Sequence, residues 1–163
     1  MSSPASIAGH PIHPMIIPFP FALWTFSLFA DVMYIWRGNQ SWERTAFYTL
    51  AGGIAGGIAA AIPGIIDYFG IKDRTVSKLA GWHARFNVLA LLLFAVSFYL
   101  RTRTGGAYMA NGDYTLPVAL SAVGFILICI SGWLGGDMVY KHGVAVNPQN
   151  DARAEERAKA RAS

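Results

Sequence analysis

The sequence predicts an all-α integral membrane protein, folded as an antiparallel four-helix bundle. Three observations predict this class. Apolar side chains make up 54% of the residues, and charged side chains make up 13%, about half the share found in soluble domains. The mean hydropathy is +0.38. Four long apolar stretches, with few charges inside them, account for about half of the 163 residues.

Each stretch suits a membrane-spanning helix, which needs roughly 20 apolar residues. The first stretch contains one charge, Asp31, and the third reaches bilayer length if its helix begins at Leu79. Lipid offers no hydrogen-bond partner to unpaired backbone N–H and C=O groups, so a spanning segment must be a helix or part of a closed barrel. The strand-like alternation of polar and apolar residues is absent, so helices are predicted throughout. The four stretches are Met15–Trp36, Phe47–Ile66, Phe86–Leu100 and Leu116–Leu134.

The predicted four-helix membrane domain covers residues 1–146, and residues 147–163 form a polar tail. Short connections make sequential helices antiparallel, so both termini and the middle loop share one membrane face. That face carries nine of the 13 Lys and Arg residues, and the other face carries four. By the positive-inside rule we expect a multi-pass protein of the bacterial inner membrane with both termini and the tail in the cytoplasm.

Several functional classes are disfavoured by composition and motifs. The lone Cys129 excludes a disulfide framework and a CxxC metal site. The basic pI of about 9.4 is explained by topology and by anionic lipid headgroups, so no nucleic-acid partner is expected. Motifs for a nucleophile elbow, a phosphate loop or a zinc-protease helix are missing, so no stand-alone catalytic activity is predicted.

Span two contains two GxxxG patterns, one from Gly52 to Gly56 and one from Gly53 to Gly57. Small residues let helix backbones approach closely in lipid. This face therefore predicts tight packing in the bundle, and it would also permit a homodimer. A second interpretation is that the smooth face formed by Gly53 and Gly57 supports a flat ligand such as a porphyrin.

All four histidines are predicted to lie at one membrane face. His10 and His13 precede span one in the sequence HPIHP, His83 is about one turn into the third helix, and His142 follows span four. Ionisable groups at membrane depth are costly and therefore indicate a functional site. Three further polar side chains are predicted at this face, namely Asp67, Asp137 and Asn87.

Several chemistries fit this set. Imidazole suits Zn, Cu, Ni and Fe, and a carboxylate can complete the coordination shell, so the histidines and Asp67 are candidate metal ligands. Two of the histidines could instead be axial ligands of haem b. A proton relay, or histidines that only bond water, headgroups or carbonyls, stays open as well. Asp31, near the opposite face, is interpreted as an interfacial acid paired with Arg37 or Arg101.

Four motifs carry a family resemblance. They are GHPIHPMIIPFP near the N-terminus, GIIDY at the end of span two, GWHARFN at the start of span three and GGDMVYKHGVAV after span four. Together they resemble the bacterial membrane-protein family catalogued as domain of unknown function 2231. The resemblance implies a compact four-helix inner-membrane domain, and the family's histidine and aspartate positions match His10, His13, Asp67, His83 and His142. Some relatives are joined to Rieske-type iron–sulfur domains, which implies a redox setting.

The resulting hypothesis is a metal- or haem-binding membrane module with a role in electron transfer, in which His83 is paired with an N-terminal histidine or with His142. This chain has no Rieske motif of its own, so a redox protein would be a separate partner. The alternative is a non-catalytic membrane subunit, transporter element or assembly factor without a cofactor. A transporter usually has more spans or inverted repeats, so this alternative would call for a homodimer.

Overall fold

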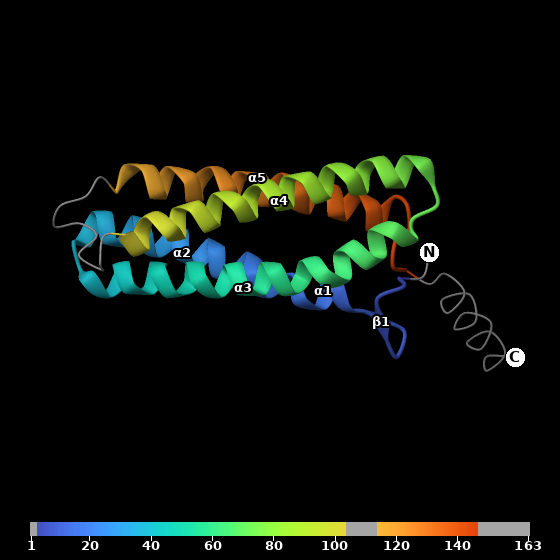
Figure 1. Cartoon of the computed structure of the whole chain (residues 1–163), viewed down its shortest axis with the longest axis horizontal. Helices are drawn as coiled ribbons and strands as arrows, with labels where there is room; N and C mark the ends of the chain where they lie inside the picture. Colours follow the sequence, from blue (N-terminus) through green and yellow to red (C-terminus); the bar gives the residue numbers. More distant parts are fainter. Residues whose placement is uncertain (1–2, 104–113, 147–163) are drawn as a thin grey trace, which may run out of the picture.

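The computed structural model describes residues 3–103 and 114–146, which form an elongated bundle of helices (Figure 1). The all-α, four-helix prediction is confirmed, while the predicted tail at 147–163 lies outside the described residues. In chain order the elements are β1 (Ser6–Ile7), β2 (His10–Pro11), α1 (Ile12–Ile16), α2 (Pro18–Arg37), α3 (Gln40–Gly70), α4 (Arg74–Arg103) and α5 (Thr115–Tyr140).

The described residues contain four helical segments that are long and apolar enough to cross a bilayer, with α1 and α2 together forming the first. The outer surface carries large apolar side chains, among them Phe19, Val88 and Leu92, whereas several polar side chains are buried inside. This distribution suits a lipid environment, where helices associate through close packing and hydrogen bonds and their outer faces meet acyl chains. The buried polar set is Ser27, Asp31, Ser97, Arg101, Ser121 and Ser131.

Local signals in the sequence set the helix ends. Gly38 ends α2 in the left-handed region, with φ of 65°, and its N–H bonds the carbonyl of Tyr34. The Asn39 side chain then caps α3 by accepting from the Ser41 N–H at 2.8 Å. Asp73 does the same before α4, accepting from the Val76 N–H at 2.9 Å. These caps keep the connections between neighbouring helices short.

The N-terminal segment folds into an element that the sequence analysis did not predict. Strands β1 and β2 form a small antiparallel hairpin in which Ile7 pairs with His10. Its turn residues Ala8 and Gly9 both have positive φ. Pro11 precedes the first residue of α1, and Pro18 begins α2, where a missing N–H costs nothing. The HPIHP motif is thereby divided, with His10 on a strand and His13 on a helix.

Both GxxxG patterns are used inside the bundle. Gly56 faces Pro20 of α2, and Gly53 and Gly57 face the indole of Trp24. Trp24 in turn stacks on Phe94 of α4, with ring centroids 4.4 Å apart, in the main core cluster. The packing interpretation of the glycine face therefore matches the structure. A homodimer stays a prediction, and it would have to use a face other than the one that α2 covers.

Candidate functional site

Two of the four histidines meet at the end of the bundle that carries the N-terminal hairpin. His13 comes from α1 and His83 from α4, and their ring centroids lie 6.2 Å apart with the planes at 81°. Both side chains are partly buried. Residues 70 positions apart in sequence thus place two imidazoles side by side within helices that span the membrane.

The His13 ring is fixed by helix α3. Its Nδ1 lies 2.7 Å from the carbonyl oxygen of Ala60, and because a carbonyl only accepts, Nδ1 is the protonated nitrogen. Gly64 makes room for the ring, since a Cβ at that position would lie 2.8 Å from His13 Nδ1. Pro63 interrupts the helical hydrogen bonding one residue earlier. In this tautomer Nε2 of His13 keeps its lone pair.

The His83 ring is held in the same tautomer by α5. Nδ1 donates to the carbonyl oxygen of Ser131 at 2.8 Å and lies 2.9 Å from its hydroxyl. Nε2 therefore accepts, and it receives the side-chain N–H of Asn87 at 3.0 Å. Gly135 leaves room here as well, because an added Cβ would lie 3.3 Å from the imidazole. Asn87, one turn after His83 on α4, thus forms a direct hydrogen bond with the His83 ring.

The remaining predicted residues lie apart from this pair. His10 is exposed on β2, and His142 follows α5. Asp67 anchors the N-terminal segment, accepting from the Ser3 hydroxyl at 2.6 Å and the Ala5 N–H at 2.9 Å. Asp137 pairs with Lys141 at 2.9 Å. Over residues 3–103 and 114–146, no three His, Cys, Asp or Glu side chains converge as a metal-binding group.

The glycine face expected to support a flat ligand carries the chain's own indole. A Cβ on Gly57 would lie 2.7 Å from Cη2 of Trp24, and one on Gly53 would overlap the same ring. A porphyrin on this face would require Trp24 to leave its stack with Phe94. As arranged, the glycine face therefore does not accommodate a porphyrin.

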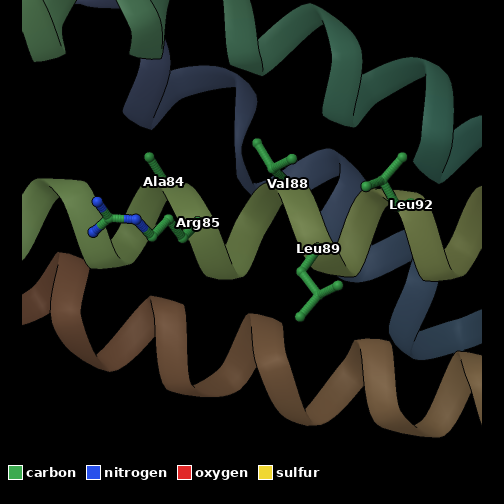
Figure 2. Close-up of a pocket in the computed structure, with 5 residues that line it drawn as sticks. All are labelled: Ala84, Arg85, Val88, Leu89 and Leu92. Atoms are coloured by element: carbon green, nitrogen blue, oxygen red, sulfur yellow. The ribbon is translucent and has the colours of Figure 1, made fainter.

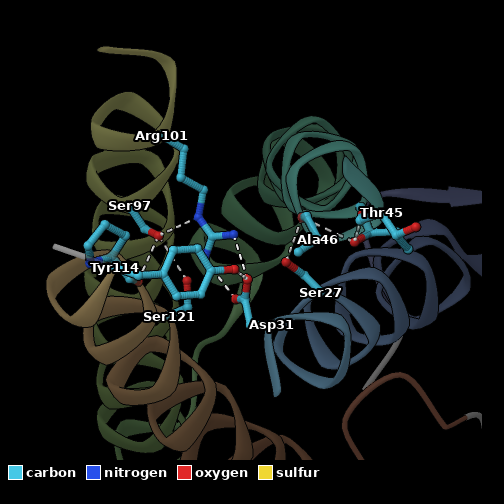
Figure 3. A network of polar contacts seen from close by, with 10 residues as sticks. Ser27, Asp31, Thr45, Ala46, Ser97, Arg101, Tyr114 and Ser121 are labelled. Carbon is cyan, nitrogen blue, oxygen red and sulfur yellow. Dashed lines mark hydrogen bonds and ion pairs between the residues drawn. The ribbon is translucent and has the colours of Figure 1, made fainter. Parts of the chain in front are cut away.

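A second polar cluster lies inside the bundle near its other end (Figure 3). Asp31 of α2 and Arg101 of α4 form two parallel hydrogen bonds, of 2.8 and 2.7 Å. The Tyr114 hydroxyl donates to the same carboxylate. Of the two predicted partners of Asp31, Arg37 and Arg101, the structure shows Arg101, and the pair is buried inside the bundle because the Asp31 side chain is 0% exposed.

Serines extend this cluster, which the sequence analysis did not include. Arg101 Nε donates to Ser97 Oγ at 3.3 Å, and Ser97 donates to the carbonyl of Pro117 at 2.8 Å. Ser97 and Ser121 lie within hydrogen-bond distance at 2.9 Å. The spacing of Ser97 and Arg101, four residues apart on one helix, was the available signal. With its charges paired, the cluster joins α2, α4 and the start of α5.

Comparison with protein families gives a match over most of the chain. Residues 9–148 match the family described as "Predicted membrane protein (DUF2231)". The chain belongs to this family. No curated protein and no solved structure matches it.

Within this DUF2231 protein, three of the motifs that suggested the family surround the histidine pair. The first supplies His13, GIIDY begins with Gly64 against the His13 ring, and GWHARFN supplies His83 and Asn87. The fourth begins with Gly135, which lies against His83. The DUF2231 motifs thus gather at one end of the bundle, and the description of the family names no activity.

Proposed function

We propose that this membrane protein binds one transition-metal ion between His13 and His83. The proposal rests on one observation, that the two imidazole rings are held in the same tautomer. Each donates its Nδ1 hydrogen to a backbone carbonyl, of Ala60 or Ser131, so each ring has its lone pair on Nε2, which in His83 accepts from Asn87. The ring centroids lie 6.2 Å apart on helices held by the rest of the bundle.

General features of metal sites support this assignment. Metal-ligating histidines almost always donate their other ring N–H to a carbonyl, carboxylate or water, which fixes the tautomer and the ring orientation. Imidazole suits Zn, Cu, Ni and Fe ions. At His83 an ion would displace the Asn87 N–H from Nε2, and the amide oxygen of Asn87 or water would then complete the shell. The two imidazoles are the ligands we assign.

The identity of the ion decides what the site could do. A redox-active ion such as copper would suit the electron-transfer role and the separate redox partner expected from the sequence. Zinc has no redox chemistry and would give a structural site. Under the same proposal the histidine pair lies at the cytoplasmic side, which the excess of Lys and Arg supports. A reporter enzyme that works only in the cytoplasm should then be active when it is fused after Val146.

One observation favours the alternative of a membrane subunit without a cofactor. Both nitrogens of His83 already have partners within the chain, Ser131 and Asn87. A purely structural histidine would have such partners too. The alternative predicts that substitution of His83 lowers the stability of the bundle and leaves metal binding unchanged.

Metal affinity of the detergent-solubilised protein separates the two functions. We expect His13→Ala and His83→Ala each to weaken Zn²⁺ or Cu²⁺ binding by at least tenfold in competition with a chromophoric chelator, a loss equivalent to about 1.4 kcal/mol. His10→Ala and His142→Ala are matched controls and should bind as the wild type does. His83→Gln, which keeps a polar side chain, guards against an effect of misfolding. Equal affinity in all variants would contradict the proposal.

A further inference from the structure

A shallow groove of about 380 Å³ runs along the outer surface of α4. Figure 2 shows the side chains that line it, with Val88 and Leu92 on one side of the helix and Leu89 on the other. Val88 is 59% exposed and Leu92 57% exposed, so these side chains face the surroundings of the bundle. In a membrane this groove would contact acyl chains.

Arg85 stands at the N-terminal end of the groove. Its guanidinium lies over the ring of Trp82, 5.2 Å from the centroid. The guanidinium also lies close to Gly81, one turn earlier on α4, because a Cβ added to Gly81 would lie 3.5 Å from Arg85 Nη1. The same Cβ would lie 3.7 Å from the Tyr68 hydroxyl. Arg85 Nη1 of α4 and the Tyr68 hydroxyl of α3 therefore both lie near Gly81.

Arg85 has an unmet electrostatic requirement. Among the described residues its guanidinium forms no ion pair, whereas Arg101, which follows the apolar part of α4 at its other end, is paired with Asp31. An arginine within a membrane-spanning helix is costly without a compensating anion or water. Trp82 marks the level of the headgroups, where tryptophans concentrate. Arg85 thus lies where lipid phosphates are found.

From this juxtaposition we propose that α4 binds an anionic glycerophospholipid, with its phosphate on Arg85 and one acyl chain in the groove. The planar guanidinium is suited to two parallel hydrogen bonds with a phosphate. The Tyr68 hydroxyl, which also lies near Gly81, would supply a further donor. The apolar side chains of Val88, Leu89 and Leu92 account for the chain below the headgroup. This site is separate from the histidine pair and does not depend on metal binding.

Arg37 provides a matched control at the other end of the bundle. Its guanidinium also lies over a tryptophan, Trp36, 4.2 Å from the ring centroid, but it does not line the groove. Removal of either charge changes the net charge of the protein equally. A general attraction to anionic membranes would respond to both substitutions, and a lipid site would respond only to the change at Arg85.

Native mass spectrometry of the full chain tests the proposal. The protein is released from micelles containing phosphatidylglycerol and phosphatidylcholine with identical acyl chains. We expect the wild type to retain phosphatidylglycerol preferentially, and Arg85→Gln to reduce that preference about fivefold, the effect of one basic residue at an anionic surface. Arg37→Gln should keep it. Val88→Trp, which fills the groove, should reduce binding of both lipids.

Any one of four results would overturn the proposal. The wild type could show no preference for the anionic lipid, or Arg85→Gln could retain the full preference. Arg37→Gln could also lose as much as Arg85→Gln, which would indicate a general charge effect. Competition by glycerophosphoglycerol, the headgroup without chains, at the same concentration as the lipid would contradict the role of the groove. Because Arg85 and Val88 are exposed, the variants should keep the helical content of the wild type.

Discussion

The carboxylate of Asp31 accepts two hydrogen bonds from the guanidinium of Arg101, at 2.8 and 2.7 Å, in the interior of the bundle. Their side chains are 0% and 3% exposed. Bidentate pairs of this kind fix orientation as well as distance. The pair joins α2 of the first two spans to α4 of the last two, so it sets how the two halves of the bundle pack.

The effects of substituting Asp31 and Arg101 on the free energy of unfolding should not be additive. Asp31→Leu or Arg101→Met alone leaves a buried unpaired charge and should lower the free energy of unfolding by about 3–5 kcal/mol. The double variant removes both charges and should recover most of that loss. Unfolding in mixed detergent micelles measures all three. Losses that simply add in the double variant would show that the pair makes no coupled contribution.

The contact of Trp24 with the glycine face predicts a large effect from a single methyl group. Gly57→Ala places a Cβ 2.7 Å from Trp24 Cη2, so the indole or the helix must shift, at a cost of about 1–3 kcal/mol. Gly132→Ala on α5 is the control, because nothing lies within 4 Å of its added Cβ. There the better helix propensity should give about 0.5–1 kcal/mol of stabilisation. Equal melting temperatures for the two variants would contradict the packing described here.

Asp67 should hold the N-terminal segment against α3. Asp67→Ala removes the acceptor for the Ser3 hydroxyl and the Ala5 N–H, so the Ala5 amide should exchange hydrogen at least tenfold faster. Asp137→Ala, which removes only the partly exposed pair with Lys141, should leave that amide unchanged. Hydrogen–deuterium exchange followed at residues 3–12 makes the comparison. Unaltered protection in Asp67→Ala would show that other contacts hold the segment.

Asn87 offers a way to strengthen the proposed metal site. Its side-chain nitrogen now lies 3.0 Å from His83 Nε2. Asn87→Asp would replace this N–H donor by a carboxylate, a common third ligand of zinc beside two histidines, and should raise Zn²⁺ affinity at least tenfold. Binding should weaken as pH falls through the range where imidazole gains a proton, since only neutral imidazole coordinates. Isothermal titration of the variant and the wild type at two pH values tests both effects. Weaker binding by Asn87→Asp than by the wild type would count against a ligand position at His83 Nε2.

Much of the fold follows from the sequence because lipid leaves few structural choices. Long apolar runs must form helices, and short connections make them antiparallel, so the bundle could be predicted. The helix ends could not be placed from the apolar runs alone. Helix α4 begins at Arg74, well before Phe86, because polar first turns capped by Asp73 extend the helix beyond its apolar part.

The histidine site was predicted only in part, for a related physical reason. The order of the spans predicts at which membrane face a residue lies. Whether two side chains at that face touch also depends on the rotation of each helix about its axis and on the residue at which each helix ends. His13 and His83 share a face and meet, whereas His10 shares that face and is carried away on β2. The ligand roles of His10, His13, His83, His142 and Asp67 all stay predictions. The hairpin that separates His10 from His13 depends on positive φ at Ala8, which carries no sequence signal.

X-ray absorption spectroscopy of the zinc-loaded protein tests the assignment of the ligands most directly. The account predicts a first shell at roughly 2.0–2.1 Å with the multiple-scattering pattern of two imidazoles. In the His10→Ala variant the pattern should persist, and in the double variant His13→Ala/His83→Ala it should disappear together with stoichiometric zinc. A wild-type spectrum without imidazole scattering, or one that survives in the double variant, would contradict metal binding between His13 and His83.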